Sequence, residues 1–155
     1  MTAFYRPALP ELWFRRQMLA DEETMSYNRA WGGTIPFPES HWPAWYARWV
    51  EPGERGRFYR YLTDDEGRFV GEAAYHTDPR QGLCLADVIV YAPCRRRGHG
   101  RQGLALLCRQ AKSDGFAALY DDMAADNPAR ELFVSMGFRE LWQADGVVML
   151  KKDLA

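Results

Sequence analysis

Apolar positions in the first third of the chain recur with helical spacing. They predict helices from about Pro10 to Ala20 and from about Glu22 to Asn28. Ser40 is placed to cap a third helix, because its hydroxyl can accept a hydrogen bond from a free N–H of the first turn. Pro52-Gly53 would end that helix. The N-terminal part of the chain is therefore expected to be helical.

The third predicted helix carries four aromatic side chains on one face. Trp42, Trp45, Tyr46 and Trp49 fall at i, i+3, i+4 and i+7. In the simplest interpretation this stripe packs against a sheet. The alternative is that part of it walls a binding pocket or forms the contact of a homodimer. The pattern leaves both interpretations open.

From Phe58 onwards the period changes to that of strands. Phe58 to Leu62 and Phe69 to His76 predict two antiparallel strands joined by a polar turn. A second turn, rich in Asp, Pro and Gly, leads into a strand over Leu83 to Tyr91. This part of the chain is predicted to form a sheet.

The last third alternates between helices and strands. Its pattern predicts a helix over about Gly98 to Asp114, a short buried strand over Ala117 to Asp121, a helix from Asn127 to a stop at Gly137, and closing strands over about Phe138 to Gln143 and Val147 to Lys151. The element order as a whole indicates a mixed α/β fold.

Composition fits one small domain spanning residues 1–155. The chain is 47% hydrophobic and 26% charged, which is enough for one packed core. A net charge of -1 gives no global argument for nucleic acid or an anionic membrane as a partner. No apolar run approaches the roughly 18 residues that would cross a bilayer. The first residues also lack the pattern of a signal peptide.

The cysteines indicate a reducing compartment. Cys84, Cys94 and Cys108 are odd in number, widely spaced and without a C-x-x-C pair. This spacing argues against a disulfide framework and against a zinc site, so we expect no metal. The cytoplasm is the expected location.

The run Arg95-Arg96-Arg97-Gly98-His99-Gly100 is the strongest chemical signal in the chain. It lies between a predicted strand and a predicted helix. The start of a helix carries free N–H groups and the positive end of the helix dipole, so three cations there repel it unless an anion is bound. The run therefore predicts a phosphate-binding site.

Part of this run matches the phosphate-binding motif of dinucleotide-binding proteins. Residues 98–103 read G-x-G-x-x-G, with Asp121-Asp122 about 20 residues further on, as in dinucleotide-binding proteins. However, in those proteins the glycines follow the strand directly, whereas here Pro93-Cys94 and three arginines intervene. Too little chain remains after Asp122 for the other parallel strands. A dinucleotide-binding protein is therefore disfavoured.

A loop of the form Arg-x-x-Gly-x-Gly, followed by an amphipathic helix, a short strand and the segment Asn127…Leu132-Phe133…Met136-Gly137-Phe138, fits better. In these features the chain resembles the GNAT superfamily of acetyl-CoA-dependent N-acetyltransferases, clearly over about residues 69–151. The resemblance implies a mostly antiparallel central sheet flanked by helices, with its fourth and fifth strands splayed to admit the cofactor.

The resemblance also implies how acetyl-CoA would bind. The arginine–glycine loop would wrap the pyrophosphate, and backbone groups near Ile89 and Val90 would hydrogen-bond the pantetheine arm. Asn127 either contacts that arm or only caps a helix, and the typical spacing of the family would place the contact on Asp126 instead. The implied cofactor-binding residues are Ile89, Val90, Tyr91, Arg95, Arg96, Arg97, Gly98, His99, Gly100, Arg101, Asn127 and Phe133.

By the same resemblance, an amine would attack the acetyl thioester directly, which requires a base. Glu72 and Asp87 are the two candidates, and either could instead be a charge on a half-exposed strand. Many family members have a tyrosine four residues before the glycine at 137, as general acid. Phe133 stands here, so Tyr120, Tyr91 or water would have to protonate the leaving thiolate.

Three functions follow in order of preference. The first is acetyl transfer to the primary amine of a small molecule or peptide. The second is a non-catalytic acyl-CoA-binding or sensing module, which the phenylalanine at 133 would explain. The third is dinucleotide binding. The acids near the predicted cleft suit a cationic acceptor, whose identity the sequence leaves open.

Overall fold

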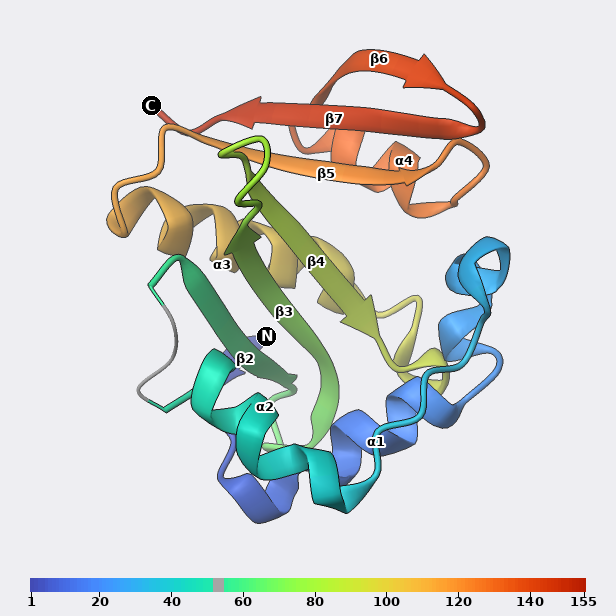
Figure 1. Cartoon of the computed structure of the whole chain (residues 1–155), viewed down its shortest axis with the longest axis vertical. Helices are drawn as coiled ribbons and strands as arrows, with labels where there is room; N and C mark the ends of the chain where they lie inside the picture. The colour runs from blue at the N-terminus through green and yellow to red at the C-terminus, as the bar shows by residue number, and fades with distance from the viewer. Residues whose placement is uncertain (52–54) are drawn as a thin grey trace.

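The computed structural model describes residues 1–51 and 55–155, and these form a mixed sheet of seven strands (Figure 1). All neighbouring strands are antiparallel except the central pair β4–β5, which is parallel. The predicted fold class is confirmed. Across the sheet the strands are β1 (Ala3–Tyr5), β2 (Arg57–Thr63), β3 (Phe69–Thr77), β4 (Cys84–Val90), β5 (Ala118–Ala124), β7 (Val147–Asp153) and β6 (Arg139–Ala144).

The sheet opens between β4 and β5. These strands are paired only where Leu85 lies opposite Tyr120, whereas β3 and β4 stay in register from Gly71–Val90 to Thr77–Cys84. Since β4 and β5 run parallel, they diverge toward their C-terminal ends, and Figure 1 shows β4 running diagonally away from β5. The predicted splay is confirmed.

One face of the sheet is covered by α3 (His99–Ser113) and α4 (Ala129–Ser135). Helix α3 presents Leu104, Leu107 and Ala111 to the sheet at the predicted spacing, and all three are fully buried. They pack in the main core with residues such as Leu119 and Val148. This core holds α3 across the strands that part.

The N-terminal segment covers the other face. Its helices and helical turns are η1 (Leu9–Leu12), α1 (Trp13–Ala20), η2 (Thr24–Trp31), η3 (Glu39–His41) and α2 (Trp42–Trp49). Phe14 and Met18 of α1 pack with Tyr59, Tyr61 and Ile89 of the sheet. The first predicted helix is thus a 3₁₀ turn followed by a short α-helix, and the second is a 3₁₀ helix.

The predicted cap of the third helix is wrong. Ser40 lies inside η3, which starts earlier because His41 N–H donates to the carbonyl of Pro38. Helix α2 then begins at Trp42 and ends at Trp49, and the predicted stop at Pro52-Gly53 lies outside the described residues. Strand β1 was not predicted, because three residues are too short to show a period.

Two neighbouring strands approach unusually closely at Gly71. A Cβ added there would lie 2.3 Å from the backbone oxygen of Ile89, so glycine alone fits. This contact fixes the end of β4 from which the chain enters η4 (Ala92–Cys94) and then α3.

Among the described helices, none is long and apolar enough to cross a membrane.

Candidate active site

The turn into α3 has the backbone of an anion-binding loop. Gly98 is the residue before the helix and has φ +87°, a conformation that side chains disfavour, and Arg96 also has positive φ at 65°. Gln102 N–H bonds the carbonyl of Gly98, which leaves the earlier N–H groups of the first turn pointing out of the helix end. The positive φ of Gly98 is therefore a feature of the turn from which α3 starts.

The arginines of this loop differ in what they contact. Arg95 donates to the backbone carbonyls of Glu23 and Thr24 at 3.3 and 3.0 Å, so it ties the loop to η2. Arg101 donates to the hydroxyl of Ser135 at 2.8 Å and links α3 to α4. Arg96 and Arg97 are exposed. The loop therefore contains one anchored arginine and two that extend into solvent.

His99, expected to contribute through its backbone, also has a buried side chain. Its Nδ1 lies 2.8 Å from the hydroxyl of Thr2, and Thr2 N–H donates to Oε1 of Gln102 at 2.6 Å. The N-terminal residues are thus bound to the first turn of α3. These contacts hold the start of the helix beside β1.

Three further predicted residues lie at the open end of β4. Ile89 is buried beneath α1, and Val90 is half-buried opposite Gly71. Tyr91 packs edge-on against Phe14, and its hydroxyl accepts a hydrogen bond from Gln17 at 2.9 Å. Beyond Leu85 this edge of β4 has no paired partner on β5 among the described residues.

A cavity of about 280 Å³ lies beside the point where β4 and β5 part. It is formed by β3, β4 and β5 together with α1, α2 and β2, and it combines acidic side chains with aromatic ones. Its lining residues are Arg15, Trp45, Trp49, Tyr59, Glu72, Ala74, His76, Leu85, Ala86, Asp87, Asp121 and Asp122. Both candidate bases are brought together here.

Glu72 is held in a buried network. Nη1 of Arg15 lies 2.6 and 2.8 Å from its two carboxylate oxygens, and the Tyr59 hydroxyl donates to Oε1 at 2.6 Å. The Glu72 side chain is 2% exposed. The guanidinium of Arg15 also lies over the rings of Trp45 and Tyr59, at 4.5 and 5.5 Å from their centres. Both oxygens of this carboxylate are therefore engaged by the protein.

Asp87 has a different environment. It lies opposite Ala74 on the neighbouring strand. Its side chain is exposed to the solvent in the cavity, but the protein atoms around the cavity leave it less solvated than a carboxyl group in water. This loss of solvation, with the nearby charge of Glu72, raises the pKa of Asp87 to about 7, against the opposing effect of Arg15. Loss of solvation and then the charge of Asp87 likewise raise the pKa of Asp121 well above its usual value. Asp87 is thus a carboxyl group that changes charge near neutral pH.

Three other predicted residues, Tyr120, Asn127 and Phe133, do not line this cavity. Tyr120 is half-buried where β5 meets β4, with Lys151 Nζ 5.6 Å from its ring centre. Oδ1 of Asn127 accepts a hydrogen bond from Ala129 N–H at 2.9 Å, the contact of a helix cap. Phe133 is buried in the main core.

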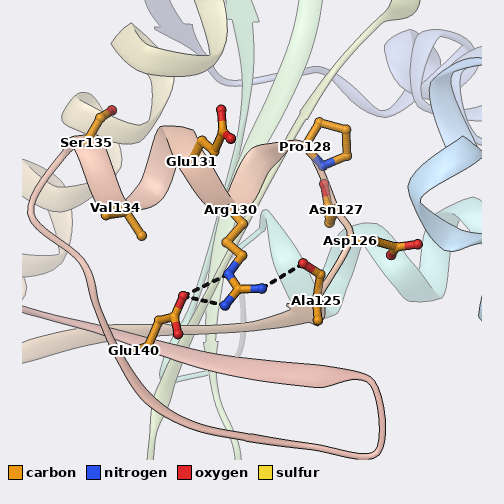
Figure 2. A pocket seen from close by; sticks show the side chains of 9 residues that line it. All are labelled: Ala125, Asp126, Asn127, Pro128, Arg130, Glu131, Val134, Ser135 and Glu140. Carbon is orange, nitrogen blue, oxygen red and sulfur yellow. Dashed lines mark hydrogen bonds and ion pairs between the residues drawn. The ribbon is translucent and has the colours of Figure 1, made fainter.

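A wider hollow of about 570 Å³ lies beside α4 (Figure 2). Figure 2 shows Arg130 bound to Glu140 and to the carbonyl of Ala125, so its charge is engaged by the chain. The hollow is lined by α4 and by Ala125, Asp126 and Asn127, which follow the C-terminal end of β5, and none of its lining residues comes from β3 or β4. Within the described part of the chain, no group of His, Cys, Asp and Glu is arranged to hold a metal.

A family model described as "Acetyltransferase (GNAT) family" matches residues 16–138, which is most of the chain. The chain belongs to the GNAT acetyltransferase family. Solved structures of acetyltransferases share this fold over most of their length. A ribosomal-protein-alanine N-acetyltransferase from Brucella melitensis is 21% identical with a TM-score of 0.74, covering 97% of this chain and 99% of that one.

Two similar structures were solved with acetyl-CoA. One is a GNAT superfamily phosphinothricin acetyltransferase from Sinorhizobium meliloti, 14% identical with a TM-score of 0.79, covering 99% of this chain and 89% of that one. The other is an acetyltransferase from Salmonella typhimurium. It is 15% identical with a TM-score of 0.73, covering 100% of this chain and 95% of that one. No curated protein matches the sequence. At these identities the likeness to solved structures establishes the fold.

Sequence reasoning missed two parts of this GNAT site. Arg15 and Tyr59 were not singled out, yet they bind Glu72, which lies 57 and 13 residues further along the chain. No local pattern connects residues at such separations. The aromatic stripe did give a signal, because Trp45 and Trp49 line the cavity as one of its two interpretations proposed.

Proposed function

We propose that this protein transfers the acetyl group of acetyl-CoA to a primary amine. The observation that carries the proposal is the position of Asp87, a carboxyl group with pKa about 7, beside the place where β4 and β5 separate. Membership of the GNAT family accounts for acyl transfer in general. Two structures of the same fold were solved with acetyl-CoA, which supports it as the co-substrate.

The cofactor fits two features of the chain. The free N–H groups at the start of α3, with the positive φ of Gly98, suit the pyrophosphate of coenzyme A. Arg96 and Arg97 are exposed beside them and would add charge. The unpaired edge of β4 at Ile89 and Val90 offers backbone groups to an extended pantetheine arm.

We assign the general base to Asp87 and a positioning role to Glu72. Asp87 is open to the cavity and has a pKa of about 7, so its ionised form can accept a proton from an ammonium group. Glu72 has both oxygens bound by Arg15 and Tyr59. Its ion pair with Arg15 joins β3 to α1 and so positions one side of the cavity.

In the proposed reaction the acceptor binds as an ammonium ion and passes a proton to Asp87. Its nitrogen then attacks the thioester carbon, the C–N bond forms and the C–S bond breaks, with the electron pair leaving on sulfur. The nitrogen passes its second proton to water, and the departing thiolate takes up one proton. Tyr120 or water would supply that proton, because Phe133 has no hydroxyl.

The second candidate is a module that binds acyl-CoA without transferring the acyl group. Phe133 favours it, because the side chain is 3% exposed and packs on Phe138 with ring centres 4.9 Å apart. No general acid is therefore available at the position where the family resemblance expects one. This candidate shares the cofactor site and differs in chemistry.

Release of free thiol from acetyl-CoA in the presence of a mixed library of primary amines tests the proposal. We expect amine-dependent release that Asp87→Asn abolishes and that Glu66→Gln, an exposed carboxyl outside the cavity, leaves intact. Stabilisation by coenzyme A with no thiol release from any amine would favour the binding module. For the compartment we retain the cytoplasm, because Cys84, Cys94 and Cys108 are all free.

A further inference from the structure

The cavity beside β4 and β5 has an unbalanced charge. Within the described residues, Arg15 is the permanent cation among those that line it, and Glu72 neutralises that cation at 2.6 Å. Three carboxyl groups then remain, on Asp87, Asp121 and Asp122. No hydrogen bond or ion pair joins these three to another described residue. The cavity therefore lacks a positive side chain that could receive an anion.

The neighbouring ionisable groups do not change this balance. Burial, and then the charge of Arg57, lower the pKa of His76, so the imidazole is neutral at physiological pH. Arg57 stacks on Trp49 at 4.5 Å from the ring centre and lies outside the cavity lining. Lys151 lies opposite Tyr120, next to the cavity, but it does not line the cavity, and its Nζ is 3.5 Å from Asp153.

The cavity is small and partly aromatic. Trp45, Trp49 and Tyr59 line it, and each ring already has a guanidinium of the chain over it, that of Arg15 or Arg57. The volume of about 280 Å³ equals about nine water molecules at ~30 Å³ each, which limits the bound group to a small one. The preference for a cation therefore rests on the carboxyl groups of the cavity.

Building on the proposed function, we infer that the acceptor is a small amine that binds as a cation and carries no carboxylate. Asp122, which is exposed at the cavity edge, is the specificity-determining residue. The raised pKa of Asp121 favours its uncharged form. An α-amino acid would bring its carboxylate against unpaired carboxyl groups in a partly desolvated cavity, where like charges repel strongly. An amine without that group meets only attraction.

Tyramine, tyrosinamide and tyrosine form a set that separates charge from size. Tyrosinamide has almost the shape of tyrosine but no negative charge. We expect kcat/KM for tyramine and tyrosinamide to exceed that for tyrosine by at least about tenfold. Equal values for tyrosine and tyrosinamide would overturn the inference, while any transfer at all would still support the proposed acetyltransferase.

Direct binding of the three ligands to the complex with coenzyme A, measured by calorimetry, tests the inference without catalysis. The same order of affinities supports it even if no acetyl transfer occurs, a result that would refute the proposed function alone. Tighter binding of tyrosine than of tyrosinamide would refute the inference alone.

Asp122→Asn tests the assigned specificity. Asp122 is exposed at the cavity edge, so the variant should fold. We expect the preference for tyrosinamide over tyrosine to fall by about threefold to tenfold, through KM for the acceptor, because one repelling charge is gone. Glu66→Gln removes an equal charge from a turn outside the cavity and should leave the preference unchanged. A preference unaffected by Asp122→Asn would contradict the assignment.

Discussion

Arg15 and Glu72 form an ion pair that closes one side of the cavity. One guanidinium nitrogen lies 2.6 and 2.8 Å from the two carboxylate oxygens, and Tyr59 donates to the same carboxylate. The pair joins α1 to β3, so it fixes the N-terminal helices over the sheet. Glu72, one of the two candidate bases, therefore also forms a contact between α1 and the sheet.

Glu72→Gln should destabilise the protein by about 3 kcal/mol, because it leaves the Arg15 cation buried without its counter-charge. Urea unfolding at pH 7 measures the change. Adding Arg15→Met to this variant should recover part of the loss, since the unpaired charge is then removed. Glu66→Gln, which breaks an exposed pair with Arg68, is the matched control and should cause no measurable change. Additive losses in the double variant would argue against a coupled pair.

Asp87→Asn should lower kcat by at least about 100-fold and remove an inflection near pH 7 from the rate profile. The sign follows from the raised pKa: below pH 7 Asp87 is protonated and cannot accept a proton, so the rate falls. Glu72 raises this pKa and Arg15 lowers it, while Asp121 lies nearby in the same cavity. Profiles of kcat against pH for both proteins provide the comparison. An inflection that persists in the variant would place the base elsewhere.

The same carboxyl group should make stability depend on pH. The usual pKa of Asp is about 3.9, and in the folded protein that of Asp87 is about 7. Ionised Asp87 is thus disfavoured by folding: its cost is absent below about pH 4, grows between pH 4 and 7, and is constant above. Asp87→Asn should match the wild type in unfolding free energy at pH 4 and exceed it at pH 8. Equal stability at pH 8 would mean that the group is fully solvated.

The sequence predicted what local patterns encode. The apolar spacing predicted a helix over about Gly98 to Asp114, and α3 spans His99–Ser113. Contacts between distant residues were not predictable: the His99 side chain meets Thr2 across 97 positions. The splay of β4 and β5 followed only from family resemblance, because no alternation of residues encodes a missing partner.

Arg95 and Arg97 should have separable roles in the loop. Arg95→Ala removes two bonds to the backbone of η2 and should lower the melting temperature. Arg97 is exposed, so Arg97→Ala should leave the melting temperature unchanged and weaken coenzyme A binding by about threefold to fivefold at low salt. Calorimetry at two salt concentrations measures this, and the difference should shrink at high salt. Equal affinity of Arg97→Ala and wild type at low salt would remove Arg97 from the cofactor site.

Phe133→Tyr tests whether the missing hydroxyl limits the reaction. Phe133 is 3% exposed and packs on Phe138 and the main core, so a hydroxyl there would lose its contact with water. We expect the variant to lose about 1 to 3 kcal/mol of stability and to show no increase in kcat. Phe133→Leu is the packing control, because it changes shape without adding a polar group. A rise in kcat of tenfold or more for Phe133→Tyr alone would contradict this expectation. It would show that the hydroxyl reaches the leaving sulfur and that this chain had lost the family's general acid.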